Sequence, residues 1–346
     1  MFSFLVRRIL QIIPTLFVIS VVLFALLALK PGNPIDEMRL GNPGFTQEDY
    51  ERLTKLYGYD QPWYFRFWKW LGRALQGDLG PSIQYGMPAT QYVFQFRLPN
   101  TALLSGLSLF FAFIIAVPLG IFSALRQHSL ADYAITIFNF IGVSIPIFWL
   151  GILLIYVFSV VIRKFLPAGG MLTPGIDWPD WGVIAAQTSG WLETLSVYLD
   201  DAWAYLVDRG SHLILPVFAL TFLQLAQWTR FMRSSMLEVI NMDYIRTARA
   251  KGLIEKKVVT RHALRNAILP IITLVALSVP ILFSGAVLTE TVFNWPGMGR
   301  AILQSIIESD FNVAMASLMF ISLLILVFNL IADVAYALID PRIRYD

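Results

Sequence analysis

The stretch TALLSGLSLFFAFIIAVPLGIFSAL, residues 101–125, contains no Asp, Glu, Lys or Arg. As an α-helix rising about 1.5 Å per residue, it is long enough to cross the roughly 30 Å hydrocarbon core of a bilayer. The stretch 133–162 is overlong and contains Pro146, so it is expected to tilt or bend. Further uncharged stretches of spanning length are 9–29, 213–229, 267–289 and 311–332. The sequence therefore predicts an all-α integral membrane protein with six transmembrane helices.

The composition also indicates a membrane environment. Hydrophobic residues make up 57% of the 346 residues and charged residues 14%, whereas a soluble domain carries about 25% charged residues. The net charge of +3 is too small to indicate nucleic acid, and the lack of cysteine excludes a disulfide framework or a thiolate site. We therefore expect a lipid bilayer as partner and no nucleic acid.

The predicted spans divide the chain into three parts. Residues 1–97 hold the first transmembrane helix, which we interpret as retained, and an extracytoplasmic loop. Residues 98–338 hold a five-helix core, and residues 339–346 form a cytoplasmic tail. The core contains an acidic, tryptophan-rich extracytoplasmic insertion at 163–210, which is either a solvated cap or a docking surface, and a basic cytoplasmic loop at 230–265.

Positive charges decide the predicted orientation. Nine of the 26 Lys and Arg residues lie within 230–265, while the insertion 163–210 carries more acidic than basic residues. Cytoplasmic segments of membrane proteins are enriched in Lys and Arg. The charge distribution therefore predicts a multi-pass protein with both termini and the loop 230–265 in the cytoplasm.

The basic loop has a regular local pattern. Asp243 is placed to cap a short helix, because Asp side chains accept hydrogen bonds from the first N–H groups of a helix. Gly252 fits the end of this helix, with Lys251 favourable in its last turn, and a second helix is expected from about 254 to 264. The small Ala248 beside this glycine corner suggests a helix that another surface approaches closely.

The run from Asp243 to Pro270 resembles the signature loop of ABC importer permeases, usually written EAA, three residues, Gly, then I-x-L-P. Here Arg246-Thr247-Ala248 replaces EAA, and Ala267 stands where the isoleucine is expected. These departures, with the longer spacing from Gly252, are similar to the dipeptide/oligopeptide branch of that family. Further segments similar to this branch follow in order along the chain: 77–80, 97–101, 288–299 and 340–345.

The resemblance implies a type I ABC importer permease fold in a bacterial or archaeal cytoplasmic (inner) membrane. It implies that the chain forms half of a translocation pathway for di- and oligopeptides, as a transport subunit and not an enzyme. The expected partners are a second related permease in a heterodimer, two cytoplasmic ABC ATPase subunits that hydrolyse the ATP, and an extracytoplasmic substrate-binding protein. The residues expected to couple to the ATPase are Asp243, Tyr244, Arg246, Ala248, Arg249, Lys251 and Gly252.

Motifs of catalysis and cofactor binding are missing from the sequence. It contains no GxxxxGK[ST] loop that would hold ATP phosphates, its three histidines are far apart, and its GxS segments lack the closing glycine of a nucleophile elbow. We therefore expect no catalytic residue, metal or cofactor in this chain. Polar residues in or near the spans are candidates for interhelical hydrogen bonds or for lining the translocation path: Asn139, Ser144, Gln224, Gln227, Ser278 and Ser284.

Two alternatives remain open from the sequence. One keeps the importer class and changes the cargo to nickel, glutathione, opines or oligosaccharides, since selectivity lies largely in another chain. The other is an ATP-independent secondary transporter or channel, which would predict paired repeats or ionisable residues in the middle of spans; the sequence has neither feature.

The predicted topology can be tested with single cysteines, because the native chain has none. A cysteine replacing Ser82 or Ser189 should react with an impermeant thiol reagent added to intact cells, and a cysteine replacing Ser235 should react only after the membrane is permeabilised. The reverse pattern of labelling would contradict the predicted orientation.

Overall fold

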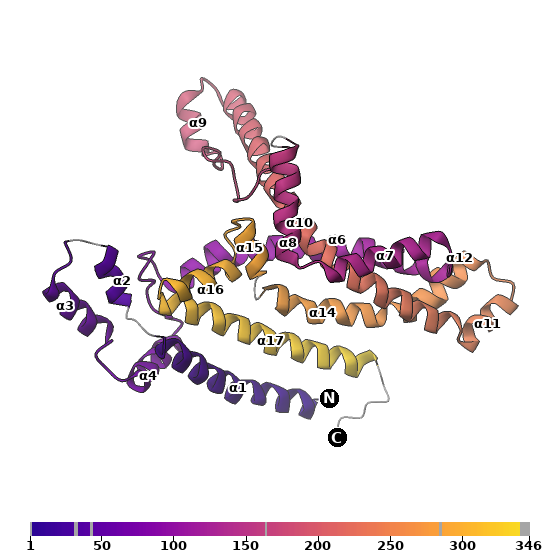
Figure 1. Ribbon diagram of the computed structural model, residues 1–346, viewed down its shortest axis with the longest axis horizontal. Helices are drawn as coiled ribbons and strands as arrows, with labels where there is room; N and C mark the ends of the chain where they lie inside the picture. The colour runs from indigo at the N-terminus through magenta and orange to yellow at the C-terminus, as the bar shows by residue number, and fades with distance from the viewer. Residues whose placement is uncertain (1, 31–33, 42–43, 163–164, 284–285, 340–346) are drawn as a thin grey trace. The chain divides into compact units, whose positions relative to one another are not determined.

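The computed structural model describes residues 2–30, 34–41, 44–162, 165–283 and 286–339 (Figure 1). Within these ranges the chain forms helices and no strand, apart from an isolated bridge between Pro81 and Pro88. The predicted all-α class is therefore confirmed for this part of the chain. Ser284, a predicted pathway residue, and residues 340–346 of the predicted tail lie outside the described residues.

The chain forms two compact units, which are described separately. Unit 1 comprises Met1–Leu103, Ile272–Val287 and Gly297–Asp346, and unit 2 comprises Leu104–Ile271 and Leu288–Pro296. These units follow packing contacts, so they do not test the division of the chain by membrane side, which stays a prediction.

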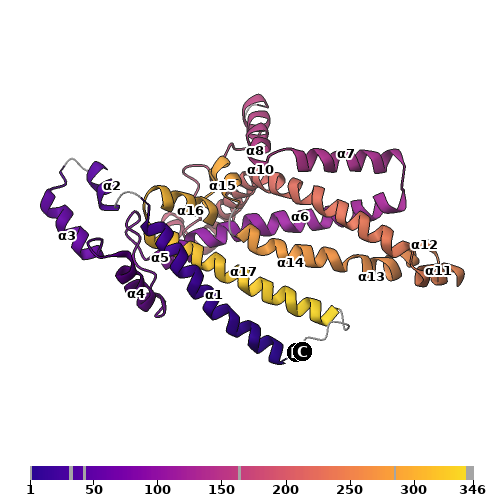
Figure 2. The ribbon, with the colours of Figure 1, turned by 60° about the horizontal axis from the view of Figure 1, so that its bottom comes forward.

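Unit 1 is organised around α1 (Phe2–Ala28) and α17 (Phe311–Ile339), which lie side by side (Figure 2). The other helices are α2 (Pro34–Gly41), α3 (Gln47–Tyr57), α4 (Trp63–Ala74), α5 (Ala89–Gln91), the π-helix η1 (Tyr92–Arg97), most of α14 (Leu269–Phe283) and α16 (Met298–Ile307). Buried Phe24, Phe67, Trp70 and Met315 join α1, α4 and α17 in one apolar cluster. The ammonium group of Lys30 donates to the last carbonyls of α16, so it also holds the end of α1 against that helix.

Unit 2 contains the longest helix of the chain, α10 (Trp191–Ile240). Its other elements are α6 (Leu98–Leu125, from Leu104), α7 (Leu130–Ser144), α8 (Ile147–Ile155), the π-helix η2 (Tyr156–Val161), α9 (Trp181–Gln187), α11 (Asp243–Ala250), α12 (Glu255–Lys257), the π-helix η3 (Val258–Ala263), α13 (Leu264–Ala267) and α15 (Val287–Val292, from Leu288). Helices α7 and α10 approach closely at Gly142, where a Cβ atom would lie 2.7 Å from the Cβ of Ala226.

Among the described residues, four helical segments are long and apolar enough to cross a membrane: Val6–Ala28, Ala89–Leu125, Trp191–Ile240 and Phe311–Ile331. Two bent pairs raise the number to six if each pair is one span: Leu130–Ser144 with Ile147–Val161, and Glu255–Ala267 with Leu269–Leu282. The structure therefore supports a multi-pass membrane protein with four to six spans.

The expected bend in the stretch 133–162 lies at Pro146, where α7 and α8 meet at 100°. Ile145 has extended backbone angles, φ −84° and ψ 122°. This conformation follows from the sequence, because the proline ring disfavours the helical conformation in the preceding residue.

Helix α10 passes through the predicted insertion, span and cytoplasmic loop without a break. Figure 1 shows α9 beside its N-terminal half, where the ring of Trp178 packs edge-on against Tyr205 at 5.2 Å. Charged residues mark the ends of the predicted span within α10, but they do not end the helix. The labelling position Ser82 is only 2% exposed and donates a hydrogen bond to Asp310, so the exposed Ser189 is the suitable outer probe.

Candidate functional site

The predicted glycine corner of the basic loop is confirmed. Helix α11 ends at Ala250, and Gly252 has a φ of +75°, the left-handed conformation that glycine adopts without strain. The chain then continues into α12, η3 and α13. The predicted side-chain cap is wrong in detail: Met242 is the N-cap, and Asp243 is the first helical residue. Asp243 therefore favours the helix by placing a negative charge at its N-terminus.

The inner face of α11 packs within unit 2. Ile245 is fully buried and Ala248 is 6% exposed, and α11 lies against η3, whose Val258 and Ala263 are fully buried. Ala248 is therefore largely covered within the chain itself, and its predicted role in coupling to the ATPase stays a prediction.

The other predicted coupling residues lie on the outer face of α11 or in the two residues that follow it. Tyr244, Arg246, Arg249, Lys251 and Gly252 are exposed. The Arg249 guanidinium donates two hydrogen bonds to the Glu255 carboxylate, at 2.7 and 3.1 Å, which closes the corner between α11 and α12. These bonds raise the pKa of Arg249. The surface around the corner is basic, with further exposed residues Lys256, Lys257, Arg261 and Arg265.

The corner is anchored to the end of α10. Ser235 Oγ donates to the carbonyl oxygen of Ala267 at 2.8 Å, and α10 packs on both η3 and α13. Met232 and Met236 of α10 are fully buried. Helices α10 to α13 therefore pack together and leave one face of α11 exposed.

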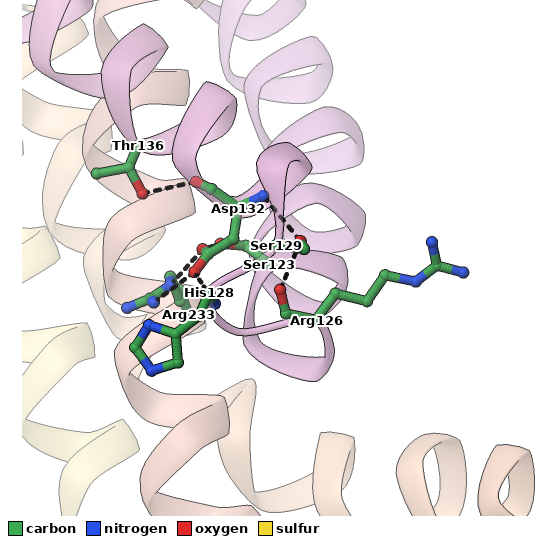
Figure 3. A network of polar contacts seen from close by, with 7 residues as sticks. All are labelled: Ser123, Arg126, His128, Ser129, Asp132, Thr136 and Arg233. Atoms are coloured by element: carbon green, nitrogen blue, oxygen red, sulfur yellow. Dashed lines mark hydrogen bonds and ion pairs between the residues drawn. The ribbon is translucent and has the colours of Figure 1, made fainter.

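A buried ion pair lies on the same part of α10 (Figure 3). Asp132, 3% exposed, accepts two hydrogen bonds from the Arg233 guanidinium, from Nε at 2.9 Å and Nη2 at 3.0 Å. The hydroxyl of Ser123 and the backbone N–H of His128 donate to the same carboxylate. Figure 3 shows Ser123, His128 and Arg233 gathered around the Asp132 carboxylate.

Local sequence places Asp132 for this role. Ser129 is the N-cap of α7 and accepts a hydrogen bond from the Asp132 N–H at 3.2 Å. His128 has a φ of 59°, an unfavourable conformation for a non-glycine residue, and its N–H bond to Asp132 stabilises it. The network joins the α6–α7 loop to α10, ten residues before Asp243. The pattern Ser129-x-x-Asp132 is the N-cap signal that sequence reasoning passed over.

The predicted pathway residues occupy different environments. Asn139 is buried on α7, and its side-chain oxygen has no hydrogen-bond partner among the described residues. Gln224 and Gln227 are half-buried on the neighbouring α10. Ser144 and Ser278 donate to backbone carbonyls of their own helices, both at 2.7 Å. The structure therefore brings Asn139, Gln224 and Gln227 onto two packed helices.

Similarity to known proteins covers the whole chain. Residues 116–345 match the family described as "Binding-protein-dependent transport system inner membrane component", and residues 1–100 match the N-terminal family of the same transport system membrane components. The chain is 41% identical to the oligopeptide transport system permease protein AppB of Bacillus subtilis, over 100% of both chains. It is 38% identical to the dipeptide transport system permease protein DppB of Haemophilus influenzae, over 100% of both chains. It is 37% identical to the di/tripeptide transport system permease protein DppB of Pseudomonas aeruginosa, over 100% of this chain and 99% of that one. The resemblance noted in the sequence is confirmed.

The Asp132–Arg233 pair gives a stability prediction. Asp132→Asn should lower the stability of the purified protein by about 3 kcal/mol, because it leaves a partly buried guanidinium without its counter-charge. The double variant Asp132→Asn/Arg233→Gln should recover part of the loss. Thermal unfolding in detergent measures both, with Asp243→Asn as the control, since its side chain is 98% exposed. Equal losses in Asp132→Asn and the control would contradict the structural role.

Proposed function

The chain belongs to the family of binding-protein-dependent transport system inner membrane components, and from this premise we propose that it forms half of the translocation pathway of an ATP-driven importer of di- and oligopeptides. The observation that carries the proposal is end-to-end similarity to proteins named as oligopeptide, dipeptide and di/tripeptide permeases. In this role the chain is a transport subunit and not an enzyme.

The proposed membrane arrangement has six spans, with each bent helix pair counted as one. Both termini and the corner at Gly252 lie in the cytoplasm, and the segment that carries α9 lies outside. The support comes from the basic loop 230–265 and the acidic insertion 163–210. The membrane is the inner membrane of a bacterium or archaeon.

The proposed assembly contains four further subunits. A second, related permease completes the pathway as a heterodimer, two ABC ATPases bind from the cytoplasm, and an extracytoplasmic binding protein delivers the cargo. The unpaired side-chain oxygen of buried Asn139, and the half-buried Gln224 and Gln227 nearby, suit a polar, uncharged lining. Such a lining passes cargo of varied sequence, because no fixed charge holds one side chain and rejects another.

Coupling to the ATPase is proposed to pass through α11. Its outer face offers Tyr244, Arg246 and Lys251 to a partner, while Ile245 and the Arg249–Glu255 pair fix the helix to its own unit. A basic surface of this kind complements an acidic groove. Only two residues separate α10 from α11, so a displacement of the corner would also move α10. The ion pair between Arg233 of α10 and Asp132 would pass this movement to the α6–α7 loop.

The cargo proposal is tested by uptake into vesicles that contain the complete complex. Labelled peptides of different sequence should enter only with ATP and the binding protein, at rates ordered by the affinities of the binding protein. Full uptake without the binding protein and ATP would indicate a channel or secondary transporter. ATP-driven uptake of nickel, glutathione, an opine or an oligosaccharide, with no peptide transported, would overturn the peptide assignment alone.

The corner is tested by two substitutions at one position. A Cβ atom at Gly252 would meet no atom within 4 Å, so any effect comes from the left-handed backbone. Gly252→Val should strain the corner by roughly 1–2 kcal/mol and reduce transport-stimulated ATP hydrolysis, whereas Gly252→Asn should reduce it less because Asn tolerates this conformation. Both variants should insert in the membrane to the same extent. Equal activity of the Val and Asn variants would rule out a role for the corner geometry.

A further inference from the structure

Unit 1 contains a cavity of about 660 Å³. Four cationic residues line it: Lys55, Arg66, Lys69 and Arg73. The rest of the wall is aromatic or uncharged, and of the described residues that line it none is acidic. Asp310, next to the cavity-lining Phe311, accepts hydrogen bonds from Ser82 and Gln84 and so is already engaged. The cavity therefore holds an excess of positive charge.

The cations of this wall have few acceptors for their N–H groups. The Arg66 guanidinium lies over the ring of Tyr59 at 4.3 Å and near Phe311 at 5.5 Å, and burial lowers the pKa of this group. Lys69 Nζ donates to Gln61 Oε1 at 2.8 Å. For Lys55, Arg66 and Arg73, no carboxylate lies within ion-pair distance among the described residues. The indole N–H of Trp70, 3% exposed in the same wall, also has no acceptor among them.

The cavity lies beside the last turns of α1, a helix long and apolar enough to span a membrane. Its wall includes Phe24, which precedes the end of α1 at Ala28 by about 6 Å along the helix axis. Helix α4 packs beside this part of α1, where Phe24 contacts Phe67 at 5.4 Å and Phe17 contacts Trp68 at 6.2 Å. If α1 spans the bilayer, a site level with its last turns would lie at the depth of the lipid headgroups.

Helix α4 has the composition of an interfacial helix. Beside its three cations it exposes large aromatic side chains: Trp63, Tyr64, Phe65 and Trp68. Aromatic rings of this kind favour the boundary between hydrocarbon and water, and a helix with one apolar and one basic face lies in the plane of that boundary. A soluble anion would account for the cations but not for these exposed rings.

We propose that this cavity binds the phosphate headgroup of an anionic phospholipid in the outer leaflet, with Arg66 and Arg73 as its main charge contacts. The phosphate oxygens supply the acceptors that the guanidinium groups lack, and the acyl chains run beside the exposed rings of α4. The site rests on the proposed orientation of the chain but not on its peptide cargo.

The test uses the complete complex in phosphatidylcholine vesicles that contain a trace of phosphatidylglycerol with a photoreactive headgroup. Crosslinked peptides are mapped by mass spectrometry. Phosphatidylglycerol should label residues 55–73. Arg66→Gln/Arg73→Gln should lower this labelling by about thirtyfold, since each of the two basic residues near a membrane surface contributes about 1 kcal/mol. Arg66→Lys/Arg73→Lys should keep most of it. Because labelling does not require transport, a failed peptide assay leaves this result unaffected.

Arg52→Gln is the matched control, because Arg52 lies on α3 outside the cavity, pairs with Asp49 and is 73% exposed. Its labelling should equal that of the native chain.

Three outcomes would overturn the proposal: equal labelling by a phosphatidylcholine probe, labelling unchanged in Arg66→Gln/Arg73→Gln, or labelling abolished by inorganic phosphate, which would indicate a soluble-anion site. If the double variant does not assemble, Arg73→Gln alone replaces it, because that side chain is exposed. The same three outcomes, measured with Arg73→Gln, would then overturn the proposal.

Discussion

Hydrocarbon offers the peptide backbone no hydrogen-bond partner, so a chain that crosses a bilayer must satisfy its N–H and C=O groups internally. This constraint accounts for the helical character of every described span. It also explains why the break between α7 and α8 takes a compact form. Pro146 has no backbone N–H to donate, but it stands at the start of α8, where the first N–H groups have no partner within the helix. The N–H of Ile145 still bonds to Ile141, and the carbonyl of Pro146 accepts from Leu150. The 100° bend therefore leaves few backbone groups to be satisfied by neighbours.

Charge is handled in two ways in this chain. In unit 2, Asp132 and Arg233 are held by complementary hydrogen bonds, so neither charge depends on water or on a partner. In unit 1, the Arg66 guanidinium lies over the rings of Tyr59 and Phe311, with no carboxylate within ion-pair distance among the described residues. A buried charge without a counter-charge is costly. The Asp132–Arg233 pair is neutralised within the chain, whereas the charge of Arg66 depends on its surroundings.

Local sequence patterns predicted the features that depend on local physics. Uncharged stretches marked the spans, and Gly252 marked the corner, because hydropathy and left-handed backbone conformation are properties of single segments. The patterns did not reveal the Asp132–Arg233 pair, whose members are 101 residues apart and meet only after α7 packs on α10. They also placed Ala248 at a partner surface, since a small residue looks the same whether η3 or another protein covers it. The continuity of α10 was missed because charge was used to mark both the membrane boundary and the helix boundary.

The unbroken course of α10 has a mechanical consequence. A helix of 50 residues is about 75 Å long, and it links the segment beside α9 to the corner at Gly252. A tilt of about 5° around its midpoint would move each end by about 3 Å in opposite directions. Such a lever works in both directions, because the coupling free energy between two sites is reciprocal. A tilt imposed at the α11 end would therefore change the surface near α9, and binding near α9 would shift α11.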